Sequence, residues 1–239
     1  MGEFGQALMN AATLIVSFDG DFLGIVGLSL RVSLSAVLIA CIIGFPLGAL
    51  LALSRFPGRG AAVAVLNALM GLPPVVVGLI VFLLLSRAGP FGVLGLLFTP
   101  TAMIIAQTIL VTPIIAALTR QTVTDLWAEY GEQLRSLGAT RADTIATLLW
   151  DGRFSLTTIV LAGFGRAIAE VGAVMIVGGN IDNVTRVMTT AIALETSKGD
   201  LEMALGLGIV LLVLALAVNG VSQAIAAGAS RASQQAVRA

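Results

Sequence analysis

Long runs without any charged residue constrain this fold more than any other feature of the sequence. Charge is absent from 32–54, 60–86, 88–119 and 203–230, and a further run, 154–181, is interrupted only by Arg166 and Glu170. Each run exceeds the roughly 20 apolar residues that a helix needs to cross the ~30 Å hydrocarbon core of a bilayer. Charged residues make up only 11% of the chain, whereas a soluble domain carries about a quarter. The sequence therefore predicts an all-α polytopic membrane protein.

The runs divide the chain into a membrane domain and two flanking segments. About five spans are expected, at 29–54, 60–86, 99–119, 154–178 and 202–226. They lie in a predicted transmembrane domain over 24–226, which follows an external segment, 1–23, and precedes a tail, 227–239. The start of the chain, MGEFGQALMN, lacks the basic region of a cleaved signal peptide, so we expect the first span to be retained as an anchor.

The basic residues predict the orientation of these spans. With five spans, one side of the membrane holds eight of them: Arg55, Arg59, Arg120, Arg135, Arg141, Arg153, Arg231 and Arg238. The other side holds four: Arg31, Arg87, Arg186 and Lys198. Because cytoplasmic loops carry the excess of Lys and Arg, the amino terminus is expected outside and the carboxyl terminus inside. The polar segment 120–153 is then cytoplasmic.

The residues that the chain lacks exclude several kinds of chemistry. It has no histidine, and its one cysteine, Cys41, lies in an apolar run, so Cys/His zinc sites and Ser/His or Cys/His catalytic pairs are excluded. The only lysine, Lys198, is not part of a phosphate-binding G-x-x-x-x-G-K-[ST] loop. The net charge of zero indicates no nucleic-acid partner. We expect no cofactor or metal on this chain, and an energy source on another subunit if transport is uphill.

Prolines inside the predicted spans indicate irregular helices. Pro46, Pro113 and the pair Pro73-Pro74 each interrupt an apolar run, and a proline removes a backbone hydrogen bond and kinks a helix. The kinks are either ordinary features of membrane helices or the lining of a pathway. After the fourth span, Thr185 is expected to cap a short outer helix, which either gates a pathway or rests on the headgroups.

The polar segment 120–153 reads as two short helices joined by a turn. The first ends at Gly138, the residue type that best adopts the left-handed cap conformation. The second begins at Thr140, with Asp143 three residues later as a capping box. Such a hairpin is either a solvated loop without special purpose or a rigid knob that docks into a partner.

Part of this segment, EQLRSLGATRADTIATLLWDG, resembles the EAA motif of type I ABC importer permeases. The motif reads E-A-A-x-x-x-G-x9-I-x-L-P, and Glu132, Gly138 and the aliphatic Leu148 match it. Gln133-Leu134 replaces Ala-Ala and Trp150-Asp151 replaces Leu-Pro. The resemblance extends over about 24–226. LPPVVVGL and GRAIAEVGAVMIVGGNI look like the molybdate/tungstate/sulfate branch, and the continuation after Thr185 looks most like its tungstate importers.

The resemblance implies a type I importer fold and a set of partners. The permease is expected in a bacterial or archaeal inner membrane, as a homodimer with two cytoplasmic ABC ATPase subunits, which bind ATP and Mg, and an external oxyanion-binding protein. The chain itself would not be an enzyme. By resemblance the ATPase-docking residues are Glu132, Gln133, Leu134, Ser136, Leu137, Gly138 and Ala139, and the apolar side chains of Leu134 and Leu137 are expected to seat in the partner.

Arg166 and Glu170 form a charged pair within the fourth predicted span. Four residues apart, they share one face of a helix, and each would cost about 2.5–3.5 kcal/mol at the bilayer centre, so this face should point into the bundle. The pair either fixes helix packing or lines the pathway, where Arg166 would transiently screen a divalent oxyanion. Pro73, Pro74, Thr189 and Thr190 complete the predicted translocation pathway.

Other functions remain compatible with parts of this pattern. Molybdate or sulfate is the alternative substrate within the importer class. A passive anion channel would explain the kinked spans and the outer helix, but it would not need an EAA-like cytoplasmic hairpin. An intramembrane protease lacks support, since the chain offers neither a Ser/His pair nor facing aspartates within spans.

Overall fold

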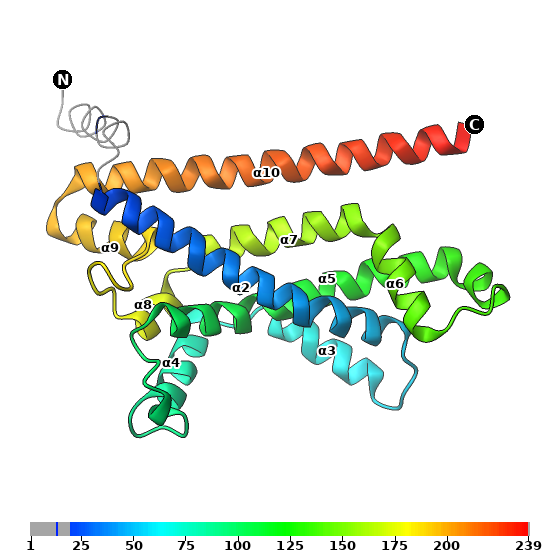
Figure 1. Cartoon of the computed structure of the whole chain (residues 1–239), viewed down its shortest axis with the longest axis horizontal. Coiled ribbons are helices and arrows are strands. Elements are labelled where there is room, and N and C mark those ends of the chain that lie inside the picture. Colours follow the sequence, from blue (N-terminus) through cyan, green and yellow to red (C-terminus); the bar gives the residue numbers. More distant parts are fainter. Residues whose placement is uncertain (1–12, 14–19, 239) are drawn as a thin grey trace. The chain divides into compact units, whose positions relative to one another are not determined.

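The computed structural model describes residue 13 and residues 20–238, and helices are the only regular elements in this part of the chain (Figure 1). The elements are α2 (Gly20–Leu53), α3 (Arg59–Leu69), α4 (Pro74–Leu85), the short 3-10 helix η1 (Gly92–Leu94), α5 (Pro100–Ser136), α6 (Arg141–Asp151), α7 (Arg153–Ile168), α8 (Gly172–Gly178), α9 (Met188–Lys198) and α10 (Leu201–Arg238). Most of the predicted external segment 1–23 lies outside the described residues.

The chain forms two compact units, each assembled from segments that are distant in the sequence. Unit 1 contains Met1–Ala36, Pro73–Ile109 and Arg166–Leu216, and unit 2 contains Val37–Leu72, Leu110–Gly165 and Ala217–Ala239. In unit 1, α4 packs against α8, and a Cβ on Gly78 would lie only 2.8 Å from the Cα of Ala173. In unit 2, α2 and α5 approach closely at Gly48. Each unit therefore has its own helix–helix packing.

The predicted all-α membrane architecture is confirmed. Among the described residues, α2, α5 and the Leu201–Ile225 part of α10 are each long and apolar enough to cross a membrane. The α3–α4 pair, bent by 98°, and the α6–α7 pair, bent by 72°, raise the number to five if each pair counts as one span.

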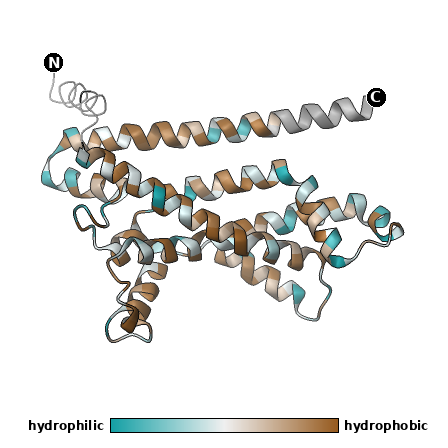
Figure 2. Cartoon of the chain, in the orientation of Figure 1, coloured by the Kyte–Doolittle hydropathy of each residue, from teal (hydrophilic) through white to brown (hydrophobic). Residues whose placement is uncertain are grey.

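The exposed faces of these helices are apolar, as expected for contact with lipid. On α2, Leu34, Leu38 and Ile42 follow one another at four-residue intervals and are exposed, whereas Ala36 and Ala40 are buried. Brown, hydrophobic residues predominate along α2 and α4, and teal residues recur around α6 (Figure 2). Small residues inward and large apolar residues outward are typical of helix packing in a bilayer.

The irregularity expected at Pro73-Pro74 is confirmed, because 60–86 is two helices separated by a bend at 70–73, where Pro73 caps α4 and Pro74 is its first residue. Two expectations about helix boundaries need correction. The span at 99–119 does not stop there, because α5 continues to Ser136 and includes the first of the two short helices expected in 120–153. The span at 154–178 is interrupted between Ile168 and Gly172.

The close approach at Gly48 gives a first testable prediction. A Cβ on Gly48 would lie 2.4 Å from the carbonyl oxygen of Ala116, so Gly48→Ala is expected to destabilise the protein by about 1–3 kcal/mol through overpacking. Gly60→Ala, in a helical position with open space around its Cα, is the matched control and should be neutral or stabilising by up to ~1 kcal/mol. Thermal unfolding in detergent compares the two, and equal shifts would contradict the packing argument.

Candidate functional site

The polar hairpin in unit 2 consists of the end of α5, the turn at Gly138 and α6. The end of α5 has a well-defined cap. Gly138 has φ of +71°, its N–H donates to the carbonyl of Arg135 at 3.0 Å, and the Ala139 N–H donates to the carbonyl of Leu134 at 3.0 Å. This pair of bonds around a left-handed residue is the Schellman motif. The chain reverses here because Gly138 adopts this conformation without steric cost, as the sequence predicted.

The second helix of the hairpin begins at the predicted capping box. The Asp143 N–H donates to Thr140 Oγ1 at 3.2 Å, and the Thr140 N–H donates to Asp143 Oδ2 at 3.1 Å. The Thr140 hydroxyl also donates to Asp143 Oδ2 at 2.5 Å. These hydrogen bonds stabilise the carboxylate, so the pKa of Asp143 lies below its ordinary value of 3.8. Their contribution is present above that ordinary pKa and is lost as pH falls through the lower, folded-state pKa.

Removing this cap should loosen the start of α6. Thr140→Ala is expected to cost about 1 kcal/mol of local stability and to accelerate amide hydrogen exchange in the first turn about fivefold. Thr157→Ala is the control, because the Thr157 hydroxyl donates to the Arg153 carbonyl within its own exposed turn and caps no helix start. Faster exchange in the control but not in Thr140→Ala would contradict the assignment.

The inner side of the hairpin is held by an apolar cluster within unit 2. Ala49, Val123 and Leu148 are its fully buried members. Leu134, Ile145 and Leu149 of the hairpin are packed against it, together with Ala52, Leu53, Leu126 and Trp127. Leu134 is half-buried, so it packs against this cluster with part of its side chain and leaves the rest accessible.

The outer side of the hairpin presents the other residues expected to dock. Leu137, at the turn, is 82% exposed. Exposure of a large apolar side chain to water is unfavourable. Glu132, Gln133, Ser136 and Gly138 are exposed and Ala139 is half-buried. Leu134 is half-buried like Ala139, so all seven predicted residues lie on one stretch that is at least partly accessible.

Trp150, near the end of α6, is a further exposed residue of the hairpin that was not among the predicted docking residues. It is 70% exposed, and the guanidinium of Arg153 lies 5.2 Å from its ring centroid and 4.8 Å from that of Phe154. Arg153 Nη1 also donates to the Trp150 carbonyl at 2.9 Å. In the sequence, Trp150 could have been noticed because it is a large aromatic residue at the position where the EAA motif has Leu.

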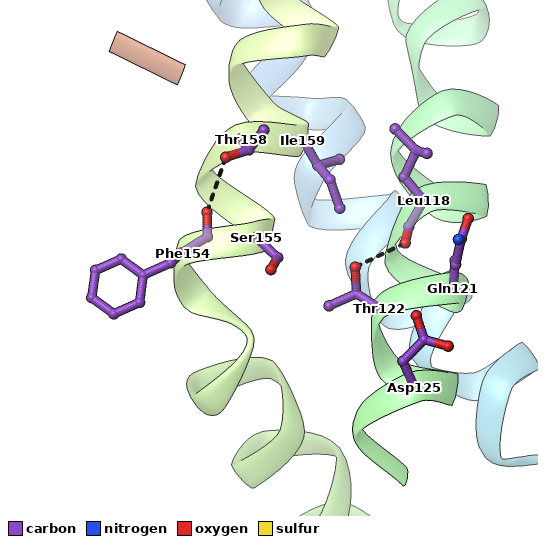
Figure 3. Close-up of a pocket in the computed structure, with 8 residues that line it drawn as sticks. All are labelled: Leu118, Gln121, Thr122, Asp125, Phe154, Ser155, Thr158 and Ile159. Atoms are coloured by element: carbon purple, nitrogen blue, oxygen red, sulfur yellow. Dashed lines mark hydrogen bonds between the residues drawn. The ribbon is translucent and has the colours of Figure 1, made fainter. Parts of the chain in front are cut away.

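Unit 2 also contains a polar pocket of about 410 Å³ between α5 and α7 (Figure 3). Its lining residues are Leu118, Gln121, Thr122, Asp125, Phe154, Ser155, Thr158 and Ile159. The hydroxyls of Thr122 and Thr158 donate to carbonyls of their own helices. The carboxylate of Asp125 disfavours anions in this pocket, because like charges repel.

The charged pair predicted within the fourth span forms in unit 1, but not on one continuous helix. Arg166 Nη1 lies 2.6 Å from Glu170 Oε2, although α7 ends at Ile168, before Glu170. Glu170 is only 4% exposed, and its Oε1 accepts the N–H of Ala173, in the first turn of α8, at 3.1 Å. The carboxylate therefore neutralises the charge of Arg166 and also accepts a hydrogen bond from a backbone N–H that would be unpaired at the start of α8.

Hydrogen bonds from neighbouring helices converge on this helix break. Thr189 of α9 donates its hydroxyl to the Glu170 carbonyl at 2.8 Å, and Gln107 of α5 donates to the Ala167 carbonyl at 3.0 Å. Ser29 Oγ of α2 accepts the Met188 N–H at 2.7 Å. Gln107 and Ser29 were not predicted; the only signal was a polar residue within an apolar run.

The other predicted pathway residues lie at different positions in unit 1. Thr190 is fully buried and caps α9, where its hydroxyl accepts the Val187 N–H at 3.1 Å. Thr185 does not cap this helix as expected, because its hydroxyl donates to the Gly178 carbonyl and accepts the Ile181 N–H. Pro73 is exposed and Pro74 half-buried. They precede Val75, whose Cγ2 would lie 2.8 Å from a Cβ on Gly172, next to the helix break.

Among the described residues, no group of three or more His, Cys, Asp or Glu side chains could hold a metal ion. The polar groups at the helix break are instead bonded to one another. At this helix break, Gln107 Oε1 is one of the buried side-chain atoms of the described residues that have no hydrogen-bond partner. It faces a small cavity of about 10 Å³ that Glu170 and Thr189 also line.

Comparisons with known proteins agree with this architecture. The chain is 44% identical over 221 residues to the tungstate uptake system permease protein TupB of Peptoclostridium acidaminophilum, covering 92% of this chain and 97% of that protein. It is 40% identical over 200 residues to a probable anion ABC transporter permease protein of Haloferax volcanii, covering 82% and 86%. The fold is similar to that of the MetNI methionine ABC transporter, with a TM-score of 0.67 at 17% identity over 85% of this chain and 95% of that chain.

The family match covers most of the chain. Residues 44–231 match the family described as the binding-protein-dependent transport system inner membrane component, and this segment contains both the hairpin and the Arg166–Glu170 pair. The chain belongs to this family and is an inner membrane permease component of an ABC transporter.

Proposed function

We propose that this chain is the permease subunit of an ATP-driven importer and forms the translocation pathway for an oxyanion, namely tungstate. The observation that supports tungstate as the substrate is the 44% identity to a tungstate uptake permease along 92% of the chain. Molybdate and sulfate are the alternative substrates, since permeases named for both are more distant relatives, at 27% and 29% identity.

An importer permease of this class works with an ATPase and an external binding protein. We propose a homodimer of this chain in the lipid bilayer with two cytoplasmic ATPase subunits, which bind ATP and Mg and carry out the hydrolysis. Two copies of the chain would each contribute one hairpin and one Arg166. The chain itself would bind no cofactor, in keeping with the absence of a phosphate-binding loop from its sequence.

The hairpin around Gly138 is proposed to dock into the ATPase. Support comes from its packing and from its exposed side chains. Leu134 and Leu148 fix the hairpin to the unit by apolar packing, whereas Leu137 at the turn and Trp150 near the end of α6 are exposed. Large exposed side chains of this kind are typical anchors of a protein–protein interface. Leu134 packs partly on the inner cluster and, being half-buried, remains one of the proposed contact residues.

Arg166 is proposed to screen the oxyanion as it passes. Its side chain is 38% exposed, whereas that of its partner Glu170 is 4% exposed, so an anion can reach the guanidinium without displacing the buried carboxylate. Glu170 keeps its bond to the Ala173 N–H when Arg166 turns away. The carboxylate also competes with the anion for Arg166, which favours transit over tight binding.

Reconstitution tests this function directly. The permease is placed in proteoliposomes with its ATPase and binding protein, and uptake of tungstate is measured with and without internal ATP and with molybdate or sulfate as competitor. The proposal expects ATP-dependent tungstate uptake that the competitors inhibit only weakly. Efficient competition by molybdate or sulfate would reassign the substrate, and anion flux without ATP would favour a passive channel.

A further inference from the structure

A pocket in unit 1, separate from the helix break, combines two arginines with the start of a long helix. The pocket has a volume of about 340 Å³, and its polar and helix-end residues include Asp21, Arg31, Pro100, Asp182 and Arg186. We call it the arginine pocket. The predicted topology places Arg31 and Arg186 on the external side of the membrane, where the binding protein would arrive.

Arg186 is held in an ordered loop with spare hydrogen-bonding capacity. The fully buried Thr185 fixes the loop, since its hydroxyl bridges the Gly178 carbonyl and the Ile181 N–H. The Arg186 side chain is 17% exposed, and its Nη1 lies 2.9 Å from Asp182 Oδ1. Within the described chain, its Nε is buried without a hydrogen-bond partner. A guanidinium has five donors, so Asp182 satisfies only part of it.

The second arginine of the pocket is available to a ligand. Arg31, on α2, is exposed, and its side chain has no ion-pair partner among the described residues. Pro100, the first residue of α5, lines the pocket but has no N–H to donate, so the positive charge of the pocket comes from the two arginines. Arginine recognises tetrahedral oxyanions through paired N–H donors.

Two carboxylates offset these charges and set how tightly the pocket can bind. Asp182, 66% exposed, accepts both from Arg186 and from the Asn183 N–H, and Asp21 also lines the pocket. An arriving anion must displace Asp182 from Arg186. This competition weakens binding of the anion to Arg186. Weak binding is required if the site is to release the anion toward the pathway.

We propose that the arginine pocket is an external acceptor site for a divalent tetrahedral oxyanion, in which Arg31 and Arg186 bind the anion and Asp182 is the competing carboxylate. This inference rests on the proposed function and adds a site to it. The anion would bind here after leaving the binding protein and before reaching Arg166.

Charge-specific variants of the permease–ATPase complex test the site. Tungstate binding is measured by calorimetry in detergent, without binding protein or nucleotide. Arg31→Gln and Arg186→Gln are each expected to weaken binding about tenfold, because each removes a charge-assisted bond. Asp182→Asn is expected to strengthen it about threefold, because it removes the competitor. Arg87→Gln, which replaces another exposed, predicted external arginine outside the pocket, should change nothing.

The outcomes separate this inference from its alternatives. Weaker binding in both Arg186→Gln and Asp182→Asn would mean that the pair only supports the loop, and it would overturn the proposal. A tenfold loss of affinity for the anion-free binding protein in the arginine variants would assign the pocket to protein docking instead, and would also overturn it. If the wild-type complex imports tungstate but does not bind it in this assay, the acceptor site fails while the proposed function stands. Absence of ATP-driven oxyanion uptake by the wild type would contradict the function itself.

Discussion

Arg166→Ala is expected to reduce oxyanion uptake about a hundredfold or more. Two copies of Arg166 would meet the anion in a homodimer, and each charge-assisted contact contributes about 1.5–3 kcal/mol. Glu170, 4% exposed, would also become an unpaired buried carboxylate, which costs about 3–5 kcal/mol. The single variant therefore combines a loss of function with a loss of stability, and uptake alone does not separate them.

The double variant Arg166→Ala/Glu170→Gln separates the two effects. The amide oxygen of the introduced glutamine can still accept the Ala173 N–H that Glu170 accepts now at 3.1 Å, and no buried charge remains. We expect this variant to assemble with the ATPase at wild-type yield and to have a thermal midpoint close to wild type, but to import no oxyanion. Glu170→Gln alone serves as control and should retain uptake. Normal uptake by the double variant would show that the pair serves packing alone.

Gly138→Val is expected to uncouple ATP hydrolysis from transport. The φ of +71° is unfavourable for a β-branched residue and costs about 1–3 kcal/mol. A Cβ at this position meets no other atom of the described residues within 4 Å, so the effect would come from the backbone and not from a clash. The turn should reorganise, and uptake per ATP hydrolysed is expected to fall about tenfold in proteoliposomes.

Two substitutions control for the conformational argument. Gly138→Asn should retain most coupling, because asparagine tolerates the left-handed conformation. Gly58→Val imposes similar strain at φ of +87°, on the turn before α3 and outside the hairpin. It should lower stability without reducing uptake per ATP. Equal uncoupling by Gly58→Val and Gly138→Val would remove the special role of the hairpin.

The features that the sequence predicted correctly depend on local interactions. The spans follow from the length of charge-free runs, and the turn follows from Gly138, the residue type that best suits its left-handed backbone. The capping box needs only Thr140 and Asp143, three residues apart. In each case the determining contacts lie within one or two helical turns, where residue spacing predicts geometry.

The features that the sequence did not reveal depend on contacts between distant segments. Leu134 lies on the inner face because Val123 and Leu148 form a cluster there, which spacing within the motif does not indicate. The helix break before Glu170 is stabilised by Gln107 and Thr189, which donate to backbone carbonyls 60 and 19 residues away. In the run 154–181 only Arg166 and Glu170 stand out by charge, and their four-residue spacing is that of an unbroken helix. α5 continues past Arg120 because no proline or glycine interrupts 114–130, so the change from apolar to polar residues does not mark a helix boundary.

Site-specific labelling of the hairpin tests the central claim most directly. Leu137→Cys, in a background in which Cys41→Ser removes the only native thiol, provides a reactive group at a position that is 82% exposed. A membrane-impermeant maleimide should label it in inside-out vesicles but not in right-side-out vesicles, and bound ATPase should protect it. Labelling from the external side, or no protection by a stoichiometric ATPase, would contradict the account that this hairpin links an internal motor to the membrane helices.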